Sequence, residues 1–172
     1  MSGLNMSMLV AGLLAFAASG AASAQADNST PSAGGVQMQQ CLDQAGNISA
    51  DRAACIGTII NACPGIEGST SDMVECIDRE LTFWDARLNG AYKDLRAVYA
   101  EQDQDEPDGM QLADDLRDTQ RAWIAWRDAK CSFAYREFRG GTIGRITGAD
   151  CMNSMTAARA MELEEHIANA RM

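Results

Sequence analysis

The chain has 172 residues, of which 47% are hydrophobic and 22% are charged, and its formal net charge at pH 7 is -10. This length favours a single domain. The excess of carboxylates argues against nucleic acid or an anionic membrane as the partner, and it is compatible with a cationic partner.

The first 24 residues have the pattern of a secretory signal peptide. They contain no charged side chain, include an apolar run from Met8 to Ala18, and end on Ala22-Ser23-Ala24, a small-x-small cleavage site. The run is too short to cross a bilayer as a helix, and no second long apolar run follows it. We therefore expect a periplasmic or secreted protein whose mature part does not insert into a membrane.

The sequence after the expected cleavage site begins with a small, polar stretch. Residues 25–37, QADNSTPSAGGVQ, predict a flexible leader, and residues 38–172 are expected to form one folded domain. The domain opens with two short helices, MQQCLDQA and SADRAACIGTIINAC, on either side of Gly46. Ser49 is the expected N-cap of the second helix.

Two long segments with helical periodicity follow. The first begins after a cap at Ser71 or Asp72 and places an apolar side chain at every third or fourth position: Met73, Ile77, Leu81, Trp84, Leu88, Tyr92, Leu95 and Tyr99. The second runs from near Met110 toward Phe138, after the acidic break EQDQDEPDG.

The four glycines of RGGTIGRITGADC predict an irregular loop over residues 139–150. A last helix is expected after a cap at Asn153 or Ser154. Because the sequence shows neither strand alternation nor repeats, we predict an all-α fold. The expected architecture is a disulfide-stapled antiparallel bundle of three long helices plus a short N-terminal helical pair.

An even number of cysteines in an exported chain predicts disulfides, and this chain has six cysteines. Helices that meet at a turn bring together residues equidistant from that turn. This geometry favours Cys41–Cys55, Cys63–Cys76 and Cys131–Cys151, although six cysteines allow many other connectivities. A metal site is the alternative, but no CxxC pair occurs and His166, the only histidine, has no cysteine within helical reach. We expect no metal and no other cofactor.

The second long helix carries a cationic side chain within its apolar face. Trp123 and Arg127 of QRAWIAWRDAKC share that face, together with Gln120 and Cys131. An unpaired buried guanidinium is costly, so we expect Arg127 to stack on Trp123 and to pair with a carboxylate from another helix, for which Asp85 is the best candidate.

The same construction places Arg159 on the inward face of the last helix. The sequence thus predicts a buried polar network of Asp85, Trp123, Arg127 and Arg159. This network either fixes the helix register, which we favour, or forms a binding pocket.

The sequence offers no catalytic motif. It has no Ser/His/Asp order, no HExxH and no phosphate-binding loop, and no free thiol remains if the cysteines pair. The carboxylates of DQDEPD lie in a solvated acidic run. We do not expect an enzyme.

Four blocks in order closely resemble the LprI-like family, named for a lysozyme inhibitor. They are WDARLNGAYKDL, QRAWIAWRDAKC, the pair Gly140-Gly141, and CMNSMTAARAMEL, and they cover roughly Cys76 to Leu163. The positions that match the family are Asp85, Leu88, Asn89, Tyr92, Gln120, Arg121, Trp123, Arg127, Cys131, Cys151, Thr156 and Arg159. No lipoprotein cysteine follows the apolar run, unlike in the family's namesake.

The resemblance implies an exported helical inhibitor whose partner is lysozyme, a strongly basic enzyme with two catalytic carboxylates in its cleft. The expected blocking element is the loop over residues 139–150, held by a Cys131–Cys151 bridge, in which Arg139 or Arg145 contacts those carboxylates. Gly140 and Gly141 belong to the same candidate target-binding loop. Two alternatives stay open: the loop only connects two helices, or the chain is an envelope interaction or scaffold module without lysozyme affinity.

Overall fold

A computed structural model describes residues 33–47, 49–105 and 109–172. The predicted signal peptide and most of the predicted leader lie outside the described residues. The described residues form six helices and no strand: α1 (Ala33–Ala45), α2 (Ser49–Ala53), α3 (Thr58–Ala62), α4 (Thr70–Asp105), α5 (Leu112–Arg136) and α6 (Thr142–Ala170). The all-α prediction is therefore confirmed.

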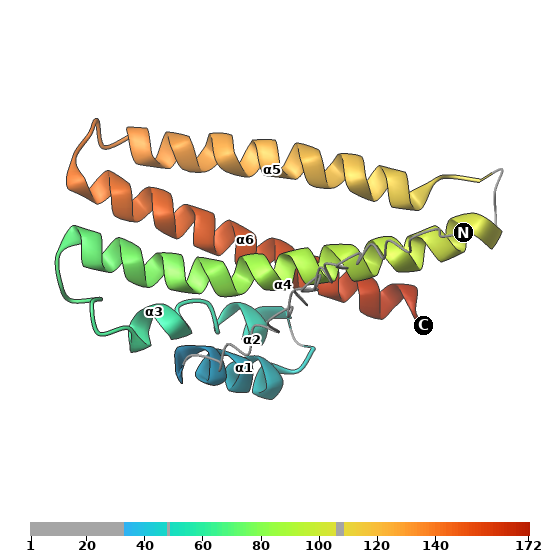
Figure 1. The fold of residues 1–172 in the computed structure, drawn as a ribbon, viewed down its shortest axis with the longest axis horizontal. Helices are drawn as coiled ribbons and strands as arrows, with labels where there is room; N and C mark the ends of the chain where they lie inside the picture. Colours follow the sequence, from blue (N-terminus) through green and yellow to red (C-terminus); the bar gives the residue numbers. More distant parts are fainter. Residues whose placement is uncertain (1–32, 48, 106–108) are drawn as a thin grey trace, which may run out of the picture. The chain divides into compact units, whose positions relative to one another are not determined.

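Each long helix runs antiparallel to the next one in the chain, so α4 and α6 point in the same direction and α5 in the opposite one (Figure 1). Helix α4 packs most extensively on α6. The helix α5 covers one side of the α4–α6 pair, and the short helices α1, α2 and α3 cover another side. The buried apolar side chains come from both groups of helices: Met38, Leu42 and Ile59 from the short helices, and Trp84, Leu88, Leu95, Leu116 and Leu163 from the long ones.

The short N-terminal helices differ in detail from the prediction. Helix α1 begins at Ala33, ahead of the expected start of the fold at Met38. The second predicted helix is split into α2 and α3, because Gly57 adopts a left-handed conformation with φ of 99°. Glycine reaches this region without steric cost, so the break falls at a residue that tolerates it.

The long helix α4 begins with a reciprocal pair of side-chain caps. The Asp72 carboxylate accepts a hydrogen bond from the Ser69 backbone N–H (2.9 Å), and the Ser69 hydroxyl accepts one from the Asp72 N–H (3.3 Å). This arrangement is a capping box. The cap is therefore Ser69, two residues before the first of the two expected positions.

Three disulfides connect neighbouring elements: Cys41–Cys55, Cys63–Cys76 and Cys131–Cys151. These are the pairs that equidistance from the turns predicts. The first ties α1 to the segment after α2, the second ties the segment after α3 to α4, and the third ties α5 to α6.

No helix among the described residues is both long enough and apolar enough to cross a membrane.

Candidate functional site

The predicted network around Trp123 lies between α5 and α6. The Arg127 guanidinium carbon is 5.1 Å from the centre of the Trp123 ring, and that of Arg159 is 5.9 Å from it. Both side chains are largely buried, with exposed fractions of 14% for Arg127 and 7% for Arg159. The structure therefore brings three of the four predicted network residues together, through cation–π contacts to one indole ring.

Each arginine is neutralised by a carboxylate of its own helix. Arg127 donates to Asp128 through Nε (3.0 Å) and Nη2 (2.9 Å), and Arg159 pairs with Glu162 (2.9 Å). Contacts between the helices come from neutral acceptors. Arg127 donates to the Thr156 hydroxyl (3.4 Å), and Arg159 donates to the Gln120 side-chain oxygen (3.0 Å).

The prediction that Asp85 pairs with Arg127 is wrong. Asp85 is exposed and accepts a hydrogen bond from Asn89, one turn along α4 (2.9 Å). The buried face of α4 is centred on Trp84 and Leu88, and Asp85 lies about 100° around the helix from Trp84. The arginines instead bury their stems and extend their head groups to surface carboxylates nearby.

A buried carboxylate that is not among the predicted site residues, Glu80, lies one turn before Trp84 on α4. Its side chain is fully buried and accepts hydrogen bonds from the backbone N–H groups of Gly57 (2.7 Å), Ile59 (2.9 Å) and Ile60 (3.2 Å). It also accepts from the Trp84 indole N–H (3.2 Å) and from the Asn153 side-chain amide (3.0 Å). Glu80 therefore joins α3, α4 and α6, with backbone dipoles in place of a cation.

A second polar cluster links the short helices to α4 and α6. Glu164 forms ion pairs with Arg52 and with Arg87 (2.5 Å from Nε), and Arg87 also donates to the Gln39 side chain (3.2 Å). Arg52 lies on α2, Arg87 on α4 and Glu164 on α6. The cluster lines a surface pocket, and the buried Arg87 Nε faces Glu164 without making a hydrogen bond.

The glycine-rich segment is mostly helical, which corrects the predicted loop over residues 139–150. Helix α6 begins at Thr142 and not near Asn153, so Arg145 lies on a helix. A Cβ atom at Gly144 would come within 2.6 Å of the Tyr135 carbonyl oxygen, and one at Gly148 within 3.1 Å of the Tyr135 Cβ. These two glycines therefore allow α6 to cross α5 closely, and they do not break the helix.

The turn between α5 and α6 is short and tightly wound. Arg139 has a φ of 48° and Gly140 a φ of 87°, and the Gly141 N–H donates to the Phe138 carbonyl oxygen (2.8 Å). A positive φ is uncommon for a residue with a side chain, so the turn constrains the backbone of Arg139, which is exposed. Of the four predicted target-binding residues, Arg139, Gly140 and Gly141 lie in this turn.

Residues 130–149, here called the α5–α6 end, carry a charge opposite to that of the whole chain. They include four cationic residues, Lys130, Arg136, Arg139 and Arg145, and one carboxylate, Glu137. None of these five side chains makes a hydrogen bond or ion pair within the described residues. Large exposed apolar side chains accompany them: Phe133, Tyr135, Phe138 and Ile143.

A shallow groove lies beside this end of the bundle. The groove contains a single charged residue, Arg145, and is otherwise lined by uncharged side chains and the Cys131–Cys151 bridge: Val74, Cys131, Ser132, Tyr135, Gly148, Ala149 and Met152. Such a surface fits an apolar group that neighbours a carboxylate.

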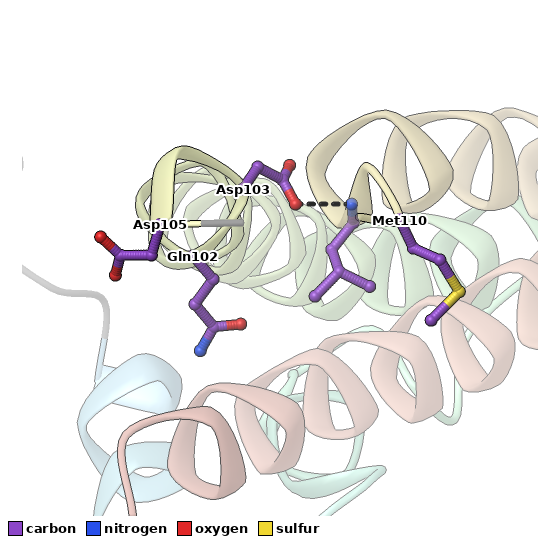
Figure 2. A pocket seen from close by; sticks show the side chains of 5 residues that line it. Gln102, Asp103, Asp105 and Met110 are labelled. Carbon is purple, nitrogen blue, oxygen red and sulfur yellow. Dashed lines mark hydrogen bonds between the residues drawn. The ribbon is translucent and has the colours of Figure 1, made fainter. Parts of the chain in front are cut away.

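The opposite end of α5 is strongly acidic. Residues 101–118 contain eight carboxylates and one arginine. Asp103 of α4 accepts hydrogen bonds from the first N–H groups of α5, at Leu112 (2.8 Å) and Ala113 (2.9 Å), and Figure 2 shows its carboxylate turned toward the start of α5. A small pocket there is lined by Gln102, Asp103, Asp105, Met110 and Leu112. The two ends of α5 thus differ in charge over about 37 Å of helix.

Hydrogen bonding also shifts pKa values at the surface. The Ser69 hydroxyl and then its backbone N–H lower the pKa of Asp72. The Arg117 guanidinium lowers the pKa of Asp118 through a side-chain hydrogen bond, while Asp118 raises the pKa of Arg117. In the part of the chain that the structure describes, no group of three or more His, Cys, Asp or Glu side chains is placed to hold a metal ion.

These features define the class: a helical bundle with three disulfides, a cation–π network under α5, and a cationic, aromatic α5–α6 end. The family model for the lysozyme inhibitor LprI matches residues 62–163, which include α4, α5 and most of α6. The chain belongs to the LprI family.

Two curated relatives are similar to this chain, and their names state no function. An "uncharacterized 17.7 kDa protein in puhA 5'region" of Rhodobacter capsulatus is 27% identical over 137 residues, which cover 76% of this chain and 84% of that protein. "Uncharacterized protein R02472" of Rhizobium meliloti (strain 1021) is 31% identical over 106 residues, covering 59% of this chain and 76% of that protein. No solved structure gives a significant match.

Proposed function

We propose that this protein is an exported lysozyme inhibitor whose α5–α6 end enters the lysozyme cleft. The observation that carries this proposal is the local reversal of charge. A chain of net charge -10 presents four cationic side chains and one carboxylate at residues 130–149, beside exposed aromatic rings. Membership of the LprI family supports lysozyme as the partner.

The chemistry of the cleft explains why a guanidinium there would stop hydrolysis. Lysozyme uses one carboxylic acid to protonate the leaving sugar and a second, ionised carboxylate to stabilise the reacting carbon. The acid works because its pKa is raised by its surroundings. An arginine held against it lowers that pKa and occupies the space of the glycosidic oxygen. Arg139, exposed in the turn, and Arg145, at the rim of the groove, are the candidates.

The remaining surface favours the encounter. The acidic part of the chain, which includes the eight carboxylates of residues 101–118, attracts a basic enzyme over long range and speeds association. The α5–α6 end then makes the specific contact. Inhibition is therefore expected to weaken as salt is added, because the long-range attraction is screened.

Export of the chain is part of the proposal. The support is the uncharged, apolar sequence of residues 1–24 and the presence of three disulfides, which persist in an oxidising compartment such as the periplasm. A cellular fractionation that found the unprocessed chain in the cytoplasm would contradict this part.

The proposal is tested by mixing the purified protein with an animal-type lysozyme in a cell-wall turbidity assay. We expect the clearing rate to fall as the inhibitor is added. The double variant R139E/R145E is expected to lose most of this inhibition. An unchanged clearing rate at a large molar excess of the wild-type protein would overturn the proposal.

A matched control is R96E, which changes one exposed arginine near the acidic end of α4. It is expected to leave inhibition close to that of the wild type. R96E makes the same charge change as either single variant, R139E or R145E. If these three variants lost inhibition equally, net charge and not the α5–α6 end would account for the effect.

A further inference from the structure

Helix α5 contacts α4 and α6 with one face, and its solvent face is apolar in the middle. Ala122, Ala125, Trp126, Ala129 and Phe133 form this surface, which we call the α5 stripe, and all five are exposed. Trp126 and Phe133 keep 61% and 64% of their surface exposed, the highest values among the large aromatic side chains. Large apolar groups aligned on one helix face indicate an interaction surface.

The stripe ends in charges of opposite sign. Asp115 lies on the same side of α5 toward its N-terminus, and Arg136 lies on it toward the C-terminus. Neither side chain has a hydrogen-bond or ion-pair partner within the described residues. Both charges are therefore available to a partner that lies along α5.

We propose that the α5 stripe is a self-association surface, on which α5 of a second copy packs antiparallel about a two-fold axis. The axis passes between Ala125 and Trp126. Asp115 and Arg136 are equidistant from this point, and so are Ala122 and Ala129. An antiparallel second copy therefore places its Arg136 against Asp115 and its Asp115 against Arg136, forming two equivalent ion pairs.

Charge complementarity selects this occupant over others. A parallel second copy would set Asp115 against Asp115 and Arg136 against Arg136. A partner of one charge sign would be repelled at one end of the stripe. The three alanines keep the centre low, so that two helices can approach closely, and Trp126, beside the axis, supplies the main apolar contact.

The interface is one helix pair, which is smaller than a standard stable interface. We therefore expect a dimer whose dissociation constant is roughly in the micromolar range. The ion pairs lie at the ends of the contact, so added salt is expected to weaken the dimer. This inference does not depend on lysozyme binding, which we assign to Arg139 and Arg145.

The test is sedimentation equilibrium of the purified protein from roughly 1 µM to 1 mM. We expect a monomer–dimer equilibrium. The variants D115R and R136D are each expected to weaken it by about tenfold or more, because each sets two like charges against each other. The charge-swapped variant D115R/R136D is expected to restore dimerisation, since its two pairs again have opposite signs.

The control E101R makes the same charge change as D115R on the exposed surface of α4, and it is expected to leave association unchanged. A protein that stays monomeric throughout the range would overturn the inference. So would a dimer that D115R/R136D fails to restore, or assembly beyond the dimer, which two-fold pairing of α5 excludes. Lysozyme inhibition measured on D115R, which lies outside the α5–α6 end, separates this result from the proposed function: D115R is expected to lose dimerisation and to keep inhibition.

Discussion

The buried Glu80 carboxylate accepts a hydrogen bond from the Asn153 side-chain amide at 3.0 Å, which connects α4 to α6 in the interior of the bundle. The same carboxylate receives three backbone N–H groups at the start of α3 and the indole N–H of Trp84. One side chain therefore satisfies donors from three helices.

We expect Glu80→Ala to be strongly destabilising. The substitution leaves three buried donors and two part-buried donors without their acceptor. An orphaned buried polar group costs about 1–3 kcal/mol, with incomplete additivity. A loss of about 3–5 kcal/mol in the free energy of unfolding is the expected outcome, measured by urea denaturation with circular dichroism. The control is Glu75→Ala on the same helix, whose exposed pair with Arg79 contributes about 0.5 kcal/mol. Equal midpoints for the two variants would contradict the assigned role of Glu80.

A pair of glycine substitutions tests the close crossing of α5 and α6. Gly144→Ala places a methyl group 2.6 Å from the Tyr135 carbonyl oxygen, so we expect a loss of about 1–3 kcal/mol as the helices move apart. Gly90→Ala, in the exposed middle of α4, meets nothing within 4 Å and is expected to stabilise by about 0.5–1 kcal/mol. Thermal unfolding of the two variants measures these opposite changes in stability. A stabilised Gly144→Ala variant would contradict the close crossing of α5 and α6 at this glycine.

The Cys131–Cys151 bridge is expected to stabilise the α5–α6 end. It closes a segment with a sequence separation of 20 residues, for which the chain-entropy model gives about 3 kcal/mol. The double variant Cys131→Ser/Cys151→Ser should lower the urea midpoint accordingly. Amide hydrogen exchange in residues 130–149 should rise more than exchange in α4. An equal rise in amide hydrogen exchange throughout the bundle would show that the bridge has no local effect.

The capping box at α4 predicts a pH dependence. The hydroxyl and N–H of Ser69 lower the pKa of Asp72, so the unfolded chain binds this proton more readily than the folded one. The contribution to stability is then present above the ordinary Asp pKa near 3.8 and is lost as the pH falls through the lowered, folded-state pKa. Carboxyl titration by NMR should show the Asp72 pKa returning toward its ordinary value in Ser69→Ala. A titration curve unchanged by that substitution would contradict the cap.

The Ser69→Ala variant also has a stability readout. Loss of an N-cap hydroxyl costs about 1 kcal/mol, and we expect this cost at neutral pH. The difference from the wild type should shrink in acid, where Asp72 is protonated in both proteins.

The periodicity of the sequence is sufficient to locate α4 and α5 and to turn Trp123, Arg127 and Arg159 inward, but it misses the first part of α6, from Thr142 to the expected start near Asn153. The disulfide pairs followed because each pair flanks one turn. The prediction for Asp85 fails because a helical wheel places it next to Trp84, at the edge of the apolar face, without showing whether its carboxylate is buried. A signal for Glu80 was present, since this residue lies one turn after Cys76 and one turn before Trp84, within the apolar face.

The glycines of residues 139–150 show a different limit. A glycine is required wherever the backbone turns left or wherever another backbone comes close, and the sequence does not distinguish these causes. Gly140 belongs to the first kind and Gly144 to the second. Only the position of Tyr135 opposite Gly144 separates them, and that position depends on tertiary packing.

The carboxylate of Asp103 has a consequence for how the family can vary. It caps α5 from the end of α4, at Leu112 and Ala113, so the first turn of α5 is positioned by a residue on the preceding helix. The connecting sequence is not needed to define where α5 begins. We expect relatives to tolerate insertions between these two helices. We also expect a protease cut there to leave both helices in register, because the hydrogen bonds that align them join Asp103 directly to the first turn of α5.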